Sequence, residues 1–144
     1  MSPLDKESIR SKLARILKNL RQLSELGKLS YKKYIQDIKN TSTAERLLHV
    51  SIEAMLDVGS HIVAEEKLGE PLEYKDVFIL LVQAKILPKS HEQAFIKLAG
   101  LRNRIVHLYD EIDHRLLHKA LKKELGDFEL FVRSIIRYLR SMKR

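Results

Sequence analysis

The sequence contains no cysteine and no tryptophan, and glycine and proline are scarce, with five and three copies among 144 residues. Without cysteine, disulfide bonds and thiolate metal sites are excluded, and a reducing compartment suits the chain. So few helix breakers, in a chain dominated by Leu, Ile, Lys, Arg and Glu, favour an all-α fold. This length can bury a core without covalent staples, so we expect a single domain spanning residues 1–144.

The sequence also lacks a long hydrophobic run. No stretch approaches the ~18 consecutive apolar residues of a membrane-spanning helix. The first ten residues, MSPLDKESIR, lack the apolar segment of a signal peptide. These absences predict a soluble, cytoplasmic protein that does not act in a membrane.

Acidic residues are outnumbered, and the excess positive charge is unevenly distributed. The net charge is +8: residues 1–40 hold ten basic and four acidic residues, and residues 115–144 hold nine and three. The middle, residues 41–114, holds eight basic and twelve acidic residues. Two basic terminal segments could attract an anionic polymer such as RNA. A well-solvated surface on a lysine-rich and arginine-rich helical protein would give the same totals, so charge alone leaves a nucleic-acid partner open.

The sequence does contain strong helical periodicity. Apolar residues recur every three or four positions, and short connections predict an up-and-down bundle of four or five helices. Ser42 or Thr43 can cap the longest early helix and Asp113 the last one, which Gly126 should weaken or kink. The expected helical segments are residues 4–27, 30–38, 44–68, 74–87, 90–109 and 114–142.

The segment RNRIVHLY, residues 102–109, stands out because donors and proton carriers alternate with apolar residues. On a helical wheel, Asn103 and His107 lie almost opposite the apolar stripe, and Arg102 and Tyr109 lie on its shoulder. The same outward arc carries three apolar residues: Ile96, Ala99 and Val106. A surface that mixes small apolar side chains with polar ones is typical of a protein–protein interface. We expect a homodimer, because two-fold dimers are the commonest soluble oligomers.

The order Arg-Asn-x-x-x-His-x-Tyr in this segment resembles the signature of the HEPN superfamily, an arginine and a histidine separated by a short spacer. More narrowly, it resembles the longer form carried by HepT-type toxins. The segments AERLLHVSIEAMLDVGSHIVAEE and PLEYKDVFILLVQAKIL also look like counterparts in that family, so the resemblance spans nearly the whole chain. It implies a homodimeric, HEPN-like helical bundle in which the motifs of two protomers line one cleft. It also implies metal-independent endoribonuclease activity without a cofactor.

Carried over by position, the resemblance makes Arg102 and His107 catalytic, Asn103 a supporting residue and Tyr109 the residue modified with AMP. The partner would be an MntA-type minimal nucleotidyltransferase, the antitoxin, bound to the homodimer or in a larger hetero-oligomer. The residue chemistry suits RNA cleavage. Histidine, with a pKa near ~6.5, can act as a base or an acid, and the planar arginine fork matches two phosphate oxygens. A dimer would supply two histidines, one for each proton transfer.

Two further sets of side chains are candidates for a site. Asp57 and His61, one helical turn apart, could share a hydrogen bond and line the cleft or the partner surface. A polar pair on the flank of the bundle is the plainer interpretation. His107, His114 and His118 have spacings that would stack like metal ligands on one unbroken helix. The segment DEID is expected to interrupt that helix, so we predict no metal site.

Three functions from different classes remain open on the sequence. The chain could be a toxin endoribonuclease that cleaves RNA. It could be a non-catalytic HEPN module that binds RNA or a nucleotide and acts as the partner of a nucleotidyltransferase. It could also be a helical interaction protein whose basic surface has another use. Loss of RNA cleavage on changing His107 would separate the first function from the second.

Overall fold

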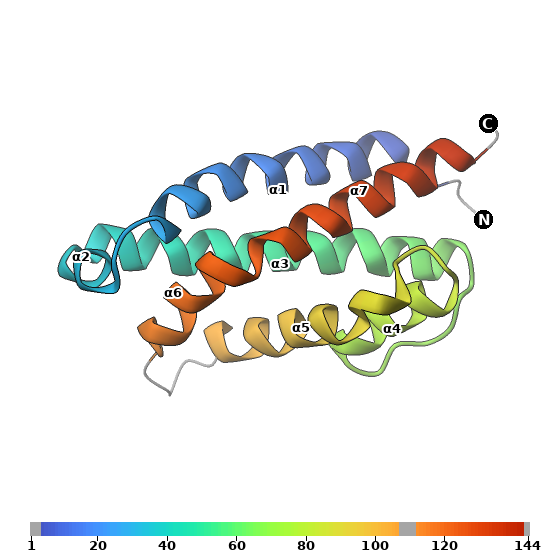
Figure 1. The fold of residues 1–144 in the computed structure, drawn as a ribbon. Helices are drawn as coiled ribbons and strands as arrows, with labels where there is room; N and C mark the ends of the chain where they lie inside the picture. The colour runs from blue at the N-terminus through green and yellow to red at the C-terminus, as the bar shows by residue number, and fades with distance from the viewer. Residues whose placement is uncertain (1–3, 107–111, 143–144) are drawn as a thin grey trace.

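The computed structural model describes residues 4–106 and 112–142, and every regular element in these two ranges is helical (Figure 1). The predicted all-α class is therefore confirmed. Seven α-helices are described where a bundle of four or five was expected, because short helices adjoin the long ones. The elements are α1 (Lys6–Gly27), α2 (Tyr31–Gln36), α3 (Ile38–Glu65), α4 (Tyr74–Gln83), the 3-10 helix η1 (Lys89–His91), α5 (Glu92–Val106), α6 (His114–Lys123) and α7 (Leu125–Ser141).

Helix α3 is the centre of the bundle. Helix α1 lies along one side of α3, the α4–α5 pair lies along another, and α7 packs beside α1 (Figure 1). Phe78 of α4, Phe95 of α5 and Phe131 of α7 pack together, with ring centroids 5.7, 6.0 and 6.3 Å apart. These rings belong to one continuous apolar core that includes residues from all of the long helices.

Helix α1 forms as its sequence predicts. Asp5 caps the first turn by accepting a hydrogen bond from the Ser8 amide at 3.0 Å. The helix ends at Gly27, where an added Cβ atom would lie 2.9 Å from the carbonyl oxygen of Leu121. Only glycine allows α6 to approach this closely, and Lys122 Nζ donates to the Gly27 carbonyl oxygen at 2.8 Å. The predicted apolar stripe is buried: Ile9, Leu13, Ile16, Leu20 and Leu23.

Helix α3 begins earlier than the sequence suggests. Its N-cap is Asp37, whose carboxylate accepts a hydrogen bond from a first-turn amide at 2.9 Å, so the prediction of Ser42 or Thr43 is wrong. The helix continues through Thr41, which is only 7% exposed and whose hydroxyl donates to a carbonyl oxygen of the preceding turn. Burial against the bundle outweighs the preference of serine and threonine for helix ends.

The last expected helix is divided into α6 and α7. Asp113 caps α6 as predicted, accepting a hydrogen bond from the Leu116 amide at 3.0 Å. The backbone leaves regular helical geometry at Glu124 (φ −112°, ψ −5°), two residues before Gly126, where a kink was expected. The Glu124 carboxylate lies 2.8 Å from Nζ of Lys97 on α5. A contact with a neighbouring helix thus accompanies the break, and helical periodicity does not reveal such a contact.

By length and composition alone, α3 could cross a membrane. In the bundle it packs against α1, α4 and α5, and more than half of its most apolar stretch is buried. The apolar side chains of α3 therefore have a packing role at the centre of the fold.

Tyr34 of α2 is fully buried, and its hydroxyl has no hydrogen-bond partner in the described part of the chain. Its ring packs against His118, with centroids 4.8 Å apart. Burial, with smaller contributions from the Glu45 carboxylate and Tyr31, raises the pKa of Tyr34 to about 12. The unsatisfied hydroxyl therefore destabilises the folded state.

Tyr34→Phe should raise the free energy of unfolding by about 1–3 kcal/mol at neutral pH, the usual cost of an unsatisfied buried hydroxyl. Between pH 10, where the unfolded chain loses this proton, and about 12, the wild type should lose further stability that the variant retains. The reason is that only the folded state holds the proton in that window. Urea unfolding at neutral pH and inside the window measures both effects. A less stable variant, or equal pH dependence of the two proteins, would contradict this assignment.

Candidate functional site

The motif arginine, Arg102, lies in the second half of α5 and directs its side chain to α3. Its Nε donates to Oε1 of Glu53 at 2.7 Å, so the two side chains form a hydrogen-bonded ion pair. Their side-chain exposures are 17% for Arg102 and 38% for Glu53, so water screens the pair only partly. A carboxylate that precedes Arg102 by 49 residues therefore fixes the direction of the guanidinium.

Two more side chains contact the guanidinium of Arg102. The ring of Tyr74, at the first position of α4, lies beneath it with 4.1 Å between Cζ and the ring centroid. Nη1 donates to the amide oxygen of Asn103 at 3.3 Å. Arginine carries five N–H donors, and residues in the two described ranges accept hydrogen bonds from two of them. Three donors are left for phosphate oxygens, on a cation whose orientation is already set.

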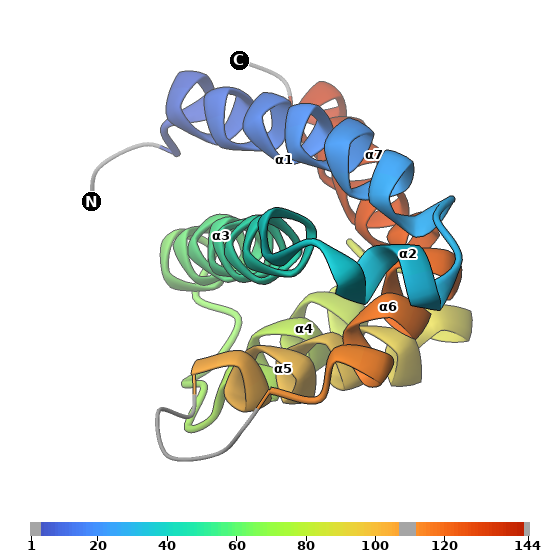
Figure 2. The same ribbon diagram turned by 90° about the vertical axis from the view of Figure 1, so that its left-hand side faces the viewer.

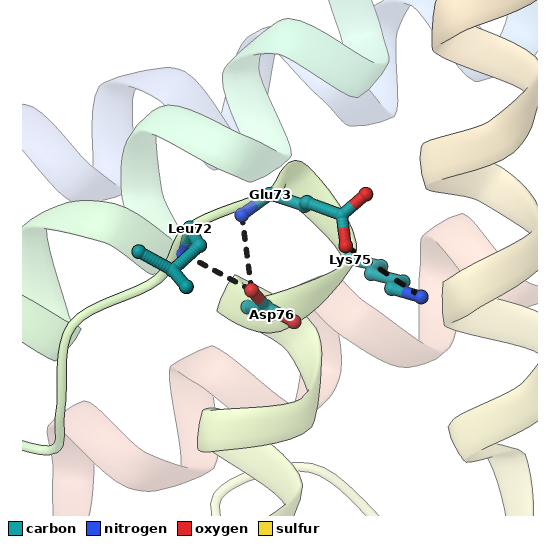
Figure 3. A network of polar contacts seen from close by, with 4 residues as sticks. All are labelled: Leu72, Glu73, Lys75 and Asp76. Atoms are coloured by element: carbon teal, nitrogen blue, oxygen red, sulfur yellow. Dashed lines mark hydrogen bonds and ion pairs between the residues drawn. The ribbon is translucent and has the colours of Figure 1, made fainter.

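Hydrogen bonds fix the loop before α4, the helix whose first residue is Tyr74 (Figure 3). Oδ2 of Asp76 accepts hydrogen bonds from the amides of Leu72 and Glu73, both at 3.0 Å. The Glu73 carboxylate lies 3.7 Å from Nζ of Lys75. These bonds satisfy backbone donors at the start of α4 and fix the entry of the chain into the helix. The position of the Tyr74 ring next to Arg102 follows from this fixed helix start.

Glu53 and Tyr74 are absent from the set of candidates that the sequence gives. The available signal for Glu53 is its spacing: it precedes Asp57 by four residues on α3, so the two carboxylates share one helix face. Tyr74 carries no signal beyond being an aromatic residue at a helix start.

The outward apolar arc expected on α5 is only partly present. Ala99 is 2% exposed within the protomer's own core, so its prediction as an outward-facing residue is wrong. Ile96 and Val106 are half-buried. Helix α5 packs against both α3 and α4, and a helix with neighbours on two sides buries a wider arc than a single stripe predicts.

His107 and Tyr109 lie outside the described residues, which stop at Val106 and resume at Ile112. The catalytic role of His107 and the modification of Tyr109 therefore stay predictions. The same holds for the supporting role of Asn103, although its amide does contact the arginine of the motif.

Asp57 and His61 lie on α3 as expected but do not share a hydrogen bond. Nε2 of His61 instead accepts a hydrogen bond from the backbone amide of Asp5 at 3.2 Å, which ties the start of α1 to α3. Asp57 is exposed and, with Glu53, lines a groove between α1 and α3. The role of Asp57 and His61 at a cleft or a partner surface stays a prediction.

His114 and His118 both lie on α6 but contact different partners. Nε2 of His118 is 2.8 Å from the carbonyl oxygen of Leu29, inside the packing of α6. Nδ1 of His114 is 3.8 Å from a carboxylate oxygen of Glu45. Within residues 4–106 and 112–142, no three His, Asp or Glu side chains converge as metal ligands.

Proteins with similar sequences are named as ribonucleases. A family model described as ribonuclease HepT-like matches residues 16–135. The tRNA nuclease HepT of Aphanizomenon flos-aquae is 30% identical over 139 residues, which cover 96% of this chain and 95% of that protein. The mRNA nuclease HepT of Shewanella oneidensis is 34% identical over 80 residues, 56% of this chain and 60% of that protein.

Solved structures with the same fold include toxin–antitoxin complexes. The tri-AMPylated HEPN toxin of Shewanella oneidensis, in complex with MNT antitoxin, matches with a TM-score of 0.80 at 26% identity, over 95% of this chain and 99% of that one. A toxin–antitoxin structure with AMP-PNP matches with a TM-score of 0.82 at 26% identity, over 92% and 99%. YutE of Bacillus subtilis matches with a TM-score of 0.84 over 98% and 94%, at 22% identity, which supports the fold alone. The predicted HEPN-like architecture is confirmed.

Proposed function

The chain belongs to the family of HepT-like ribonucleases, and we propose that it is an endoribonuclease that acts as the toxin of a toxin–antitoxin pair. The observation that carries this proposal is the motif arginine, which Glu53 and Tyr74 hold and which has three N–H donors that no residue of the described ranges accepts. The names of the relatives support it, since one is a tRNA nuclease and another an mRNA nuclease. With cellular RNA as the proposed substrate, we propose that the protein acts in the cytoplasm.

The proposed chemistry needs a base for the 2′-hydroxyl, an acid for the leaving 5′-oxygen and a cation for the crowded phosphorane. The guanidinium of Arg102 binds the phosphate oxygens as charge builds up on them, and His107 carries a proton. Attack of the 2′-oxygen on phosphorus breaks the bond to the 5′-oxygen and leaves a 2′,3′-cyclic phosphate. Glu53 and Tyr74 keep the guanidinium at a fixed angle, so little reorganisation is needed in the transition state.

A second copy of the chain is proposed to complete the site. One protomer carries one motif histidine, whereas cleavage needs both a base and an acid. A two-fold dimer would place two copies of the motif in one cleft, so that one His107 can act as base and the other as acid. Of the three outward-facing apolar residues expected on α5, Ile96 and Val106 are half-buried, and such a contact could cover them.

The proposed partner is an MntA-like minimal nucleotidyltransferase that silences the toxin by transferring AMP to Tyr109. The support comes from the similar HEPN toxin, which is tri-AMPylated and bound to an MNT antitoxin. The complex would contain the homodimer or a larger hetero-oligomer.

Purified wild-type protein should cleave RNA, and Glu53→Gln should lower kcat/KM by about 10–100-fold. Glutamine keeps the shape of the side chain and can still accept the hydrogen bond from Nε of Arg102, but it carries no charge. The charge-assisted bond of about 1.5–3 kcal/mol is therefore weakened, and the direction of the guanidinium is held less firmly. Cleavage kinetics should show the loss mainly in kcat, and circular dichroism should show unchanged helix content.

Glu25→Gln is the matched control. It removes one carboxylate from an ion pair with Lys28 in which both side chains are 71% exposed, so activity should stay within about twofold of wild type. A wild-type protein without cleavage activity would refute the proposed function. Equal activity of Glu53→Gln and wild type would refute only the positioning role of Glu53.

A further inference from the structure

A polar groove runs between α1 and α3, two helices that lie side by side (Figure 2). Its volume is about 520 Å³, and eight of its ten lining residues are polar or charged. Three of them are basic: Lys12 and Arg15 from α1, and Arg46 from α3. All three side chains are exposed, and none forms an ion pair with a carboxylate of the described ranges.

The groove reaches the motif arginine through one shared residue. Glu53 lines the groove and also accepts the hydrogen bond from Nε of Arg102 at 2.7 Å. Arg46 precedes Glu53 by seven residues on α3, which corresponds to two turns and ~10 Å of helix. The basic side chains therefore line the same groove as Glu53, the residue that holds the motif arginine.

Two hydrogen bonds fix the register of α1 on α3. The Asp5 amide donates to Nε2 of His61 at one end, and Nδ2 of Asn19 donates to Oγ of Ser51 at the other, at 3.2 and 3.1 Å. Both basic residues that α1 contributes lie between these two points. Because the helices are antiparallel and tied at both points, the backbone positions that carry Lys12 and Arg15 are fixed relative to Glu53 on α3 before any ligand binds.

We propose that this groove holds the sugar–phosphate backbone of single-stranded RNA beside the phosphodiester that Arg102 binds. The proposal rests on the proposed ribonuclease function and adds a binding surface to it. Lysine and arginine bind phosphate oxygens without reading the base, so three such side chains suit successive phosphates. Of the two carboxylates in the groove, Glu53 is neutralised by Arg102, which leaves Asp57 against three positive charges.

The lining favours a nucleic-acid backbone over a protein surface. Protein interfaces have apolar centres that are depleted in lysine, whereas Val50 and Ala54 are the two apolar residues of this lining. Among the described residues, no Phe, Tyr or Trp lines the groove, so stacking of bases on aromatic rings is not expected there. We therefore expect RNA to be held through its phosphates, with little dependence on sequence.

The test compares two triple variants that remove the same charge. The groove variant is Lys12→Gln/Arg15→Gln/Arg46→Gln. The control is Arg133→Gln/Arg137→Gln/Arg140→Gln, three exposed arginines of α7 that do not line the groove. The probe is a fluorescent single-stranded RNA with 2′-O-methyl groups, which lacks the nucleophile needed for cleavage. Fluorescence anisotropy over a series of salt concentrations gives Kd and its salt dependence.

The groove variant should bind about tenfold or more weakly at low salt. The slope of log K against log salt should become shallower by about 2, since each contact with single-stranded RNA contributes roughly 0.7. With cleavable RNA, KM should rise while kcat stays within about twofold, and the control should bind and cleave like wild type.

Equal losses in the groove variant and the control would overturn the proposal, because total charge would then explain the binding. Unchanged RNA affinity in the groove variant, with loss of self-association or of antitoxin binding, would also overturn it and assign the groove to a protein partner. The two hypotheses fail separately. A wild type that binds RNA through the groove but never cuts it refutes the ribonuclease function. If the wild type cleaves RNA and the groove variant has the same KM as the wild type, the groove is refuted as an RNA-binding surface.

Discussion

Arg102→Ala should abolish RNA cleavage, with kcat/KM about 10²–10³-fold or more below wild type, while the helical fold remains. The substitution removes the positive charge and the three N–H donors that the described contacts leave for phosphate. The fold should survive because Glu53 is 38% exposed and can be rehydrated, so the loss of unfolding free energy should stay near ~1 kcal/mol. Cleavage kinetics and urea unfolding of the same preparation measure the two effects.

Arg104→Ala is the control for this result. Arg104 is an exposed arginine on the same helix and has no ion-pair partner in the described ranges, so the variant should cleave RNA like wild type. His107→Ala should lower kcat/KM by about 10²–10⁴-fold, the usual contribution of a general acid or base. Full activity of Arg102→Ala or of His107→Ala would refute the assignment of the motif.

Co-expression with the companion nucleotidyltransferase should add AMP to Tyr109 and stop cleavage. Tyr109 follows Arg102 by seven residues, and a phosphodiester there would compete for the donors of Arg102 and repel incoming RNA. The adenosine would obstruct the site as well. Intact mass spectrometry should show one or more AMP additions on wild type and none on Tyr109→Phe. Tyr109→Phe alone should remain an active toxin in the presence of the antitoxin.

Tyr74→Phe is the matched control for the modification. Tyr74 is 43% exposed and lies under the guanidinium of Arg102, so it is a second phenol beside the same arginine. AMP addition should be unchanged in this variant. An unmodified wild type, or AMP that maps to Tyr74, would count against silencing through Tyr109.

Helical periodicity was a reliable guide to which face of a single helix is buried. The stripe of α1 is buried as predicted, and Arg102, predicted on the shoulder of α5, is half-buried. The same reasoning failed for Ala99, because α5 is covered by two neighbours rather than one. Helix α3 begins after Asp37, with Thr41 buried against the bundle, and the break at Glu124 accompanies an ion pair with Lys97 of α5.

The side chains that contact the motif arginine could not be predicted from the sequence. A helical wheel shows where Arg102 points, but not that Glu53, 49 residues earlier, lies opposite it, or that Tyr74 lies beneath it. Those contacts depend on how α3, α4 and α5 pack. His107 and Tyr109 were identified through resemblance to the HEPN motif, and their roles stay predictions because they lie outside the described residues.

The most direct measurement of the central claim is end-group analysis of RNA incubated with the purified wild-type protein in excess EDTA. Cleavage by arginine and histidine side chains predicts fragments with 2′,3′-cyclic phosphate and 5′-hydroxyl ends, formed at the same rate with and without added Mg²⁺. RNA that is cut only after a divalent metal is added, or fragments with 5′-phosphate ends, would contradict this mechanism. RNA that is bound and never cut would instead identify the chain as a non-catalytic HEPN binding module.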